Sequence, residues 1–547
     1  MSRQKLSAVV LLTALPLASP GLVRGQDRQS APATPPEGVV LELSIGEAVE
    51  RALKNNTDLA VEKFNPEASA EDVRSAQGAY DPFLQAQVHK NSTDTPAQSA
   101  FSGAQTVNTG TWTWNFGASQ LLKTGATWSV AFDNNKQTTN SVFTTYNPSF
   151  FSSLNLNITQ PLFKNLKTDS ARAQLIISKN NRAISDTDFR QTVINTVANV
   201  KELYYDVIFN MDNLQAARKS LTLAQKLLNE NQIKVKVGTL APLDVVEAES
   251  EVASREEGVI TAENALAQAE DSLKAAIFPK NDPTTWSTHL IPTDRPSAEP
   301  REVDAAAAVR NALEKRTDII AARKSLENND VSLRLAANQT KPQFDLIGAY
   351  GGAGQGGTQI IRDGFGGPII STVPGGYGDA LSSVFGRDFP TWTVGVNLSY
   401  PLFNRQAKAA QARAAISKDQ ALASLNRLEL QIATQVRSAA RNVETNYKRV
   451  QSSGAARVLS TRRLDAEEKK FAAGMSTNFL VTQAQRDLAV AEVSELQSIA
   501  DYRKSIIELD RVQEAGSGTG TGQILSTPTS GANATLQTGL AQISQGQ

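Results

Sequence analysis

The chain has 547 residues, with 55 basic and 55 acidic side chains, and it contains no cysteine. A formal charge of zero provides no overall field to attract nucleic acid or anionic lipid, so nucleic acid is not an expected partner. Without cysteine there are no disulfides and no thiol chemistry, and stability has to come from packing and assembly.

The amino terminus is typical of a secretory signal. Arg3 and Lys5 precede an apolar run that prolines interrupt, and small residues follow where a peptidase would cleave. The run is too short to span a membrane. We therefore expect residues 1–25 to be a signal peptide and the Pro-rich residues 26–42 to be a linker.

Helical periodicity follows the linker. Apolar side chains recur on one face of residues 43–56, and Ser44 with Glu47 forms a capping box that would begin this helix. A second helix is predicted over residues 66–78, where Gly78 is a natural end.

Stretches rich in Thr, Asn and aromatic residues come next and predict strands over residues 83–89, 111–119, 126–132 and 152–160. In the last stretch, apolar side chains alternate with Asn and Thr. Such a pattern suits either a half-solvated soluble sheet or a barrel with lipid outside and water inside. Aromatic side chains concentrated in these stretches favour the barrel, where they would form interfacial belts.

A very long helix is predicted from about residue 168 to residue 236. Apolar positions at steps of four and three form a heptad seam, and at 1.5 Å per residue the helix would reach roughly 100 Å. A turn at 238–242 leads into a returning helix in which Val245, Val252 and Val259 are seven residues apart. A hairpin of this length indicates an extended layer of long helices side by side rather than a globular helix bundle.

The same signals recur in order in the second half. Residues 156–163, which end in Pro-Leu-Phe, return as residues 396–403. We expect a first repeat at 43–279, a Pro-rich linker at 280–300, a second repeat at 301–515 and a disordered tail at 516–547. The repeats differ in one place: the first has an extra hairpin at 111–132, whereas the second has a Gly-rich stretch at 351–378 that we expect to be a flexible loop.

Catalytic, metal and cofactor chemistry finds no support in the sequence. The two histidines, His89 and His289, have no ligand-like spacing. The glycines at 351–357 lack the following Lys-Ser or Lys-Thr of a phosphate-binding loop. We therefore expect no enzyme activity, no cofactor and no metal site.

Taken together, the repeated signals resemble the TolC-like outer membrane efflux protein family, also called outer membrane factors. The resemblance covers about residues 43–512. Three pairs of motifs support the resemblance. They are the helix starts at 48–58 and 308–318, the strand-to-helix junctions Gln160-Pro161-Leu162-Phe163 and Tyr400-Pro401-Leu402-Phe403, and the turns Val237-Gly238-Thr239 and Ala473-Gly474-Met475. Each is degenerate alone, but the set becomes specific when it occurs twice, in order, after a signal peptide.

The resemblance implies a mainly α fold with a membrane β-barrel. Each chain of a homotrimer would give long antiparallel coiled-coil hairpins to a periplasmic tunnel and four strands to one 12-stranded barrel in outer-membrane lipid. Elementary physics agrees, because four strands cannot close a barrel with a wet interior, whereas three chains leave no open edge.

The function implied is an outer-membrane exit duct of a tripartite efflux or type I secretion system. It would passively conduct substrates from an inner-membrane RND or ABC pump and a periplasmic adaptor, or membrane fusion protein, to the exterior. The tip residues that would contact the adaptor are Val237, Gly238, Thr239, Ala473, Gly474 and Met475. Pro161 and Pro401 mark the strand-to-helix junctions.

The chain departs from the family pattern at the expected tunnel constriction. Family members often carry acids just beyond the second turn, whereas here Asp244 keeps the first-half position and Leu480 and Gln483 occupy the second. Our hypothesis is an apolar closure involving Leu480 that gates partly by dewetting. The alternative function is a periplasmic coiled-coil adaptor or scaffold, which predicts a single hairpin flanked by soluble β domains.

Overall fold

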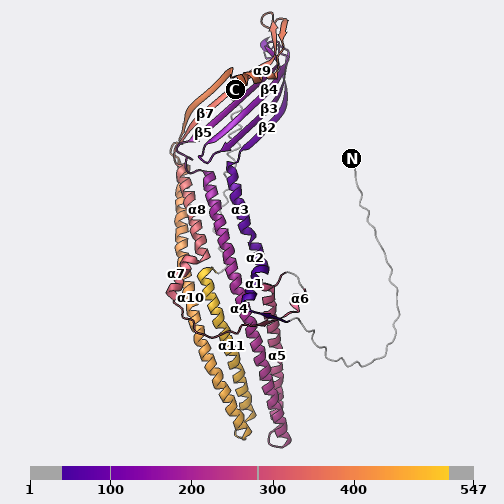
Figure 1. Cartoon of the computed structure of the whole chain (residues 1–547), viewed down its shortest axis with the longest axis vertical. Helices are drawn as coiled ribbons and strands as arrows, with labels where there is room; N and C mark the ends of the chain where they lie inside the picture. The colour runs from indigo at the N-terminus through magenta and orange to yellow at the C-terminus, as the bar shows by residue number, and fades with distance from the viewer. Residues whose placement is uncertain (1–39, 99, 280–282, 517–547) are drawn as a thin grey trace, which may run out of the picture.

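The computed structural model describes residues 40–98, 100–279 and 283–516. The molecule is elongated, with a curved sheet at one end and two helical hairpins that run away from it (Figure 1). The expected signal peptide, most of the linker 26–42 and the expected tail beyond Gly516 lie outside the described residues. Both predicted repeats lie almost entirely within them.

Each repeat begins with short helices and ends with a long hairpin. The first repeat contains α1 (Ile45–Asn55), α2 (Thr57–Glu62), α3 (Phe64–Gln77), α4 (Ser170–Lys236) and α5 (Pro242–Ile277). The second contains α7 (Ala305–Lys315), α8 (Thr317–Gln339), α10 (Arg405–Ala472) and α11 (Asn478–Glu514). Two more helices, α6 (Pro283–Trp286) and α9 (Tyr377–Gly386), are short, as are the 3-10 helices Gly78–Tyr80 and Ala100–Ser102. Each helix of the described part of the chain is too short or too polar to cross a membrane.

Local sequence signals account for the helix starts. The capping box predicted before α1 is present: the Glu47 N–H donates to the Ser44 hydroxyl at 3.3 Å, and the Ser44 N–H donates to the Glu47 carboxylate at 3.1 Å. At the start of α4 the Asp169 carboxylate accepts from the Arg172 N–H. These caps satisfy amide groups that have no partner within the helix.

The long helices lie side by side in two levels. Near the sheet the order of neighbours is α3, α4, α8, α10, and farther away it is α5, α4, α11, α10. α4 and α10, with 67 and 68 residues, therefore run through both levels and confirm the predicted rods. Three apolar clusters hold them together, one around Tyr204 of α4, one around Tyr502 of α11 and one around Phe471 near the far end.

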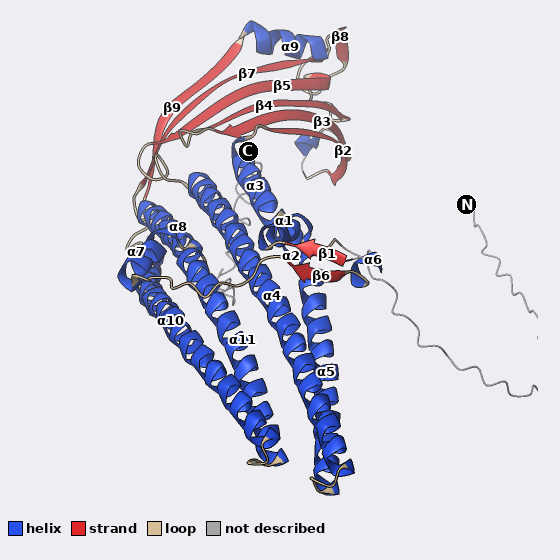
Figure 2. Ribbon diagram, turned by 60° about the horizontal axis from the view of Figure 1, so that its bottom comes forward, coloured by secondary structure: helices blue, strands red, loops and turns tan. Residues whose placement is uncertain are grey.

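A short strand at the end of the first expected linker pairs with one inside the second, a tertiary contact that the prediction did not include. β1 (Val40–Leu43) is parallel to β6 (His289–Pro292), and the pair lies across the helices (Figure 2). The Tyr204 hydroxyl donates to the Leu43 carbonyl at 2.9 Å and accepts from the Asp294 N–H at 3.2 Å. Because this pairing joins segments far apart in the chain, local composition could not reveal it.

A seven-stranded sheet forms the other end of the molecule. Its strands are β2 (Phe83–Pro96), β3 (Thr106–Leu121), β4 (Thr127–Thr139), β5 (Tyr146–Pro161), β7 (Gln343–Arg362), β8 (Ile369–Val373) and β9 (Phe389–Ser399). They follow the order β2-β3-β4-β5-β7, and β8 and β9 both pair with β7. All of these pairings are antiparallel.

This sheet has more strands than the four that the family resemblance implied. The extra hairpin at 111–132 is confirmed, and its strands β3 and β4 pair with β2 and β5 as full members of the sheet. β8 adds a short strand beside the far end of β7. Alternating sequence therefore identified the four strands of the first repeat and β9 but not β7 and β8, and the family pattern gave too low a number.

The pairing register sorts the side chains onto one apolar and one polar face. Opposite residues of antiparallel strands point to the same side, and Val130 of β4 pairs with Ala118 of β3 and Leu156 of β5. The apolar face also carries Leu84, Val88, Trp112, Phe116, Phe132, Ile158, Tyr350, Trp392, Val394 and Leu398. The polar face carries Asn115, Ser119, Ser129, Asn135, Asn157, Thr159, Thr393 and Asn397. This division is typical of a barrel with lipid outside and water inside.

The stretch 351–378 is not the flexible loop that its glycines suggested. It forms the second half of β7, then β8 and the start of α9. α9 packs directly on the apolar face: a Cβ atom added to Gly354 would lie 2.0 Å from the Ala380 carbonyl oxygen, and one added to Gly356 would lie 2.3 Å from the Gly376 carbonyl oxygen. The glycines are thus needed for a close helix-to-strand approach, a tertiary requirement that overrides their low strand propensity.

A polar contact fixes the position of α9. The Trp114 indole N–H donates to the Tyr377 hydroxyl at 3.3 Å, and that hydroxyl donates to the Asn134 side-chain oxygen at 2.8 Å. The Trp114 and Tyr377 rings also meet edge to face, with centroids 5.2 Å apart. α9 is therefore attached to β3 and β4 as well as to β7.

We expect Gly354→Ala to displace α9, because the new methyl group has no room beneath the helix. The loss of folded stability should be about 1–3 kcal/mol, as for other overpacked sites. It can be measured as a lower temperature at which the detergent-purified protein loses its native gel mobility. Gly348→Ala is the matched control, since Gly348 lies on the same strand and face with open space around it. Equal thermal stability of both variants would contradict this account of the glycines.

Candidate functional site

The two turns at the far end of the helical hairpins are built alike. In the first, the Gly238 N–H donates to the Val235 carbonyl at 3.0 Å and the Thr239 N–H to the Lys234 carbonyl at 2.9 Å. In the second, the Gly474 N–H donates to the Phe471 carbonyl at 3.2 Å and the Met475 N–H to the Lys470 carbonyl at 2.9 Å. Both are Schellman ends with a left-handed glycine, at φ +78° and +75°.

These tips present apolar side chains to solvent. Val237 is 71% exposed and Met475 is 75% exposed, and a Cβ atom added to Gly238 or Gly474 would meet open space. Leu243 and Phe479, each at the start of a returning helix, are also exposed. All six predicted tip residues thus lie in two small turns that another helical tip could approach closely.

A buried pair of asparagines joins the two hairpins just above the turns. The Asn231 amide of α4 donates to the Asn478 side-chain oxygen of α11 at 2.7 Å, and both residues are almost completely buried. Each also donates, at 3.4 Å, to the backbone carbonyl of Asp244 at the start of α5. Three helices are thereby tied together through one carbonyl group.

An ion pair forms a second link, about two helical turns farther from the tip. Glu251 of α5 is buried and accepts from Arg486 Nε of α11 at 3.0 Å, while Arg255 Nη2 lies 2.6 Å from its other oxygen. Burial raises the pKa of the Glu251 carboxyl, but the hydrogen bonds and charges of the two arginines outweigh burial and lower it below its ordinary value. Lys234 of α4, 3.5 Å from the ring centroid of Phe471 of α10, adds a cation–π contact.

The residues expected at the constriction lie near these links, Asp244 at the start of α5 and Leu480 and Gln483 on the first two turns of α11. Asp244 joins the asparagine pair through its backbone carbonyl. Leu480 is 42% exposed on the first turn of α11, and the Gln483 amide donates to the Asp487 carboxylate at 2.8 Å. Within one chain these side chains form a surface rather than a closed ring.

The two predicted strand-to-helix junctions have different surroundings. Pro161 is buried at the end of β5, and the next residue, Leu162, donates its N–H to the Phe344 carbonyl of β7 at 2.8 Å. Phe163 packs edge to face on Phe344, with ring centroids 5.6 Å apart. Pro401 is exposed after β9, at an edge of the sheet, and has no such neighbour among the described residues.

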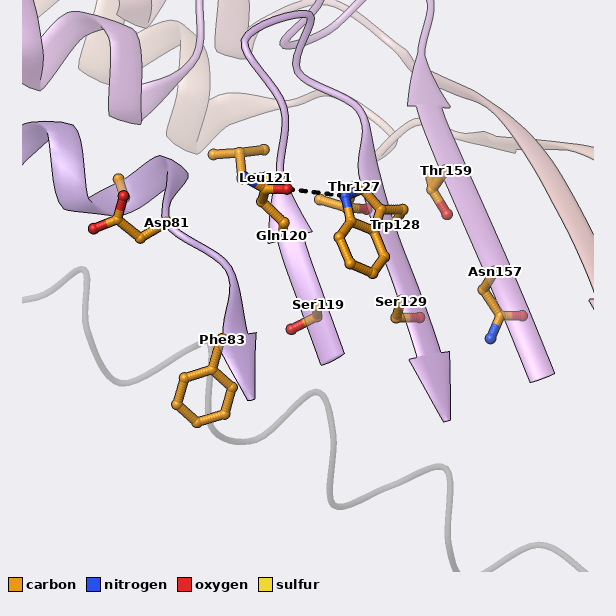
Figure 3. A pocket seen from close by; sticks show the side chains of 11 residues that line it. Asp81, Phe83, Ser119, Gln120, Leu121, Thr127, Trp128, Ser129, Asn157 and Thr159 are labelled. Atoms are coloured by element: carbon orange, nitrogen blue, oxygen red, sulfur yellow. Dashed lines mark hydrogen bonds between the residues drawn. The ribbon is translucent and has the colours of Figure 1, made fainter. Parts of the chain in front are cut away.

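The polar face of the sheet holds a shallow pocket of about 300 Å³ close to the helices. Figure 3 shows Ser119, Ser129 and Asn157 at one level on adjacent strands, as their pairing register requires. Small neutral groups of this kind line a wet surface and lack the convergent charges of a selective binding site.

Sequence reasoning found the turns and missed the links between the hairpins. Asn231 continues the buried positions Ala224 and Leu227 of α4, and Asn478 begins the buried positions Val481 and Ala484 of α11. An asparagine within an apolar seam is a known signal for a specific partner across the seam. That signal was available, but the partner could not be identified without the fold.

An amphipathic sheet continued by helical rods that end in exposed turns defines a class of channel proteins that join a barrel to a helical tunnel. The chain belongs to the outer membrane efflux protein family, whose sequence model matches residues 48–277 and 308–512. The two matched segments correspond to the two repeats. This membership gives an outer-membrane location, with the helical part in the periplasm, and a role in transport.

Individual relatives agree with the family assignment. The chain is 21% identical over 361 residues to the outer membrane protein TolC of Vibrio cholerae serotype O1, covering 65% of this chain and 75% of that protein. It is similar in structure to the outer-membrane channel OprN, with a TM-score of 0.62 and 16% identity over 86% of this chain and 90% of that one. The CmeC outer membrane channel of Campylobacter jejuni gives a TM-score of 0.58 and 16% identity, over 86% and 85% of the two chains. At these identities the structural likeness shows the fold.

We expect Glu251→Gln to loosen the contact between the hairpins, because the arginine-paired carboxylate is lost. The link should weaken by about 1–3 kcal/mol. Since the pKa of Glu251 is lowered in the folded chain, the link is intact above the ordinary carboxyl pKa and is lost as pH falls through the lowered value. The unsubstituted chain should therefore come to resemble Glu251→Gln only in acid.

The measurement is the distance between spin labels on Ser250→Cys and Val490→Cys, the only thiols in an otherwise cysteine-free chain. Glu251→Gln should broaden the distance distribution at neutral pH. Glu257→Gln, an exposed position on the same helix, is the matched control. An unchanged distribution in Glu251→Gln would show that the ion pair does not hold the hairpins together.

Proposed function

We propose that three copies of this chain assemble into the outer-membrane exit duct of a tripartite efflux or type I secretion system. The sheets would form a barrel in the membrane, and the helices would continue the bore through the periplasm. A periplasmic adaptor would bind the helical tips, and an inner-membrane pump of the RND or ABC type would supply the driving energy. The duct itself is passive.

The observation that carries this proposal is the arrangement of polar and apolar surfaces along one elongated molecule. The sheet has an apolar outer face and a polar inner face with few charges, and the tips at the opposite end expose small and apolar residues. The first surface fits lipid on one side and water on the other. The second fits a partner with helical tips of its own.

The alternative function, a periplasmic adaptor or scaffold, agrees less well with the structure. It predicts a single helical hairpin between soluble β domains, whereas this chain has two hairpins that join one sheet. Exposed Trp392, Val394 and Leu398 on one face would also be unfavourable for a soluble sheet.

We expect Gly238→Trp and Gly474→Trp to reduce adaptor capture at least tenfold, because an indole ring would block close approach of another helix tip. Retention of the cognate adaptor on immobilised trimer measures the effect. Since a left-handed conformation at these positions costs a non-glycine residue about 1–2 kcal/mol, Gly238→Asn separates turn strain from bulk. Gly258→Trp, at an open position on α5, controls for the added indole. Undiminished capture by both tip variants would exclude these turns as the docking site.

We also propose that Leu480 helps to close the tunnel by dewetting. Leu480→Asp should raise the resting conductance severalfold and increase cation selectivity, because a ring of carboxylates hydrates the constriction. Single-channel recording in planar bilayers measures both properties. Leu480→Met preserves the apolar character and is the control. If Leu480→Asp conducts like the unsubstituted channel, the constriction lies elsewhere.

A further inference from the structure

We propose that the barrel of this duct has eighteen strands, six from each copy, and that β9 of one copy closes it against β2 of the next. The inference rests on the homotrimer proposed above. It departs from the 12-stranded barrel that the family resemblance implied. Three observations support it: the way helices lead into strands, the widths of the two layers and the equivalence of the two repeats.

Each helix near the sheet leads into one strand. α3 precedes β2, β5 precedes α4, α8 precedes β7, and β9 precedes α10. The helices lie in the order α3, α4, α8, α10, and their strands lie in the matching order β2, β5, β7, β9. The hairpin β3–β4 is inserted between β2 and β5, so six strands lie side by side next to four helices. The short strand β8 pairs with the same edge of β7 as β9 does, farther from the helices.

An inserted hairpin preserves the alternation of strand directions. β2 and β9 therefore run in opposite directions, as they would have done without the insertion. β9 of one copy can consequently pair antiparallel with β2 of the next. Closure by three identical sheets then gives an even number of strands and no unpaired edge.

The widths of the two layers also match. Strands about 4.8 Å apart and tilted by about 40° each occupy roughly 6 Å of circumference, so six strands need about 38 Å. Four helices packed 8–10 Å apart need roughly 32–40 Å. Four strands would need only about 25 Å, and the barrel would have to taper. With eighteen strands the bore keeps the width of the helical tunnel through the membrane.

The contact between the two repeats inside one chain provides a template for the contact between copies. Within the chain, the Leu162 N–H bonds to the Phe344 carbonyl and Phe163 packs on Phe344. The corresponding residues of the second junction, Leu402 and Phe403, are 85% and 74% exposed. The residue that corresponds to Phe344 is Leu84, because Pro82 before β2 matches Pro342 before β7.

Leu84 is itself 76% exposed at the opposite edge of the sheet. The exposed junction after β9 and the exposed start of β2 are thus two halves of an interface whose complete form already exists between β5 and β7. A second copy of this chain is the occupant that completes it.

This template fixes the register between copies. Inside the chain Pro161 is opposite Asp345, so between copies Pro401 should be opposite Gln85. It follows that Ser399 is opposite Gln87 and that Leu398 is opposite Val88. Ser399 and Gln87 both belong to the polar face, and Leu398 and Val88 both belong to the apolar face. A register shifted by one residue would place apolar side chains in the bore.

Pairs of introduced cysteines test the proposal, because the chain has none of its own. Ser399→Cys with Gln87→Cys should link different copies into covalent dimers and trimers. Gln87→Cys with Asn115→Cys tests β2 against β3 within one chain, and Asn135→Cys with Phe151→Cys tests β4 against β5. A short thiol-reactive crosslinker is applied to native outer membranes, and the products are separated on denaturing gels without reductant.

We expect all three pairs to crosslink, and the first to give at least tenfold more intercopy product than Ser399→Cys with Val88→Cys. In that control the second thiol lies on the opposite face. A strand count by electron cryo-microscopy of the purified trimer should give eighteen. If Ser399 and Gln87 link but either intrachain pair does not, the hairpin lies outside the barrel and the strand number is wrong.

The outcomes separate this inference from the proposed duct. A trimer with twelve strands, or one in which Ser399 and Gln87 stay unlinked, overturns the eighteen-stranded barrel and leaves the duct intact. A chain that remains monomeric in outer membranes, judged by unboiled gels of the unsubstituted protein, overturns both.

Discussion

An unpaired strand edge cannot exist in the hydrocarbon of a bilayer, where no water is present to bond its N–H and C=O groups. The sheet of this chain has two such edges, at β2 and at β9, and its apolar face requires lipid. The membrane-embedded part of the protein is therefore incomplete as a single chain. The sheet has to close into a barrel that encloses water. This requirement accounts for its polar inner face, for the exposed junction after β9 and for the direct connections between helices and strands.

Because the chain contains two similar repeats, one kind of strand contact can serve both within a chain and between chains. One kind of contact occurs within the chain between β5 and β7. β5 leads into the long helix α4, and the neighbouring strand β7 follows the helix α8. In the proposed threefold assembly this contact would be repeated between copies, so that the sequence would have to specify only one kind of interface. The repeats diverge where divergence leaves that interface intact. The first repeat gained the β3–β4 hairpin in the interior of the sheet, and the second gained α9 on the apolar face.

Elements whose cause is local were predictable from the sequence. Ser44 and Glu47 formed their capping box, the heptad seam gave α4 nearly to the residue, and both glycine turns lie at the tips. Alternation identified the four strands of the first repeat and β9, because one face of each is apolar, whereas the Gly-rich β7 and the short β8 were not recognised as strands. The failures all involve partners distant in the chain: β1 with β6, and Gly354 beneath α9. A glycine kept for close packing has the same local appearance as a glycine kept for flexibility.

The candidate site likewise contains residues that the sequence alone could identify and residues that it could not. Gly238 and Gly474 were recognisable because a left-handed helix end requires glycine whatever surrounds it. The role of Asn231 depends on Asn478, which comes from the other repeat, and the low pKa of Glu251 depends on Arg486 across α4. Each polar group was visible in the sequence, but its function exists only once two hairpins lie side by side.

These polar links also indicate where the assembly can move. Separating an apolar interface exposes hydrocarbon to water, whereas Asn231, Asn478 and Glu251 would exchange their partners for water, at a smaller net cost. The apolar cluster around Phe471 also joins the hairpins near the tips, but it contains fewer buried residues than the clusters around Tyr204 and Tyr502. Those larger clusters and the continuous backbone bonds of the sheet resist separation farther from the tips. The tips are thus the part of the wall whose separation exposes the least apolar surface, and in the proposed duct this is the end that would meet the adaptor and pump.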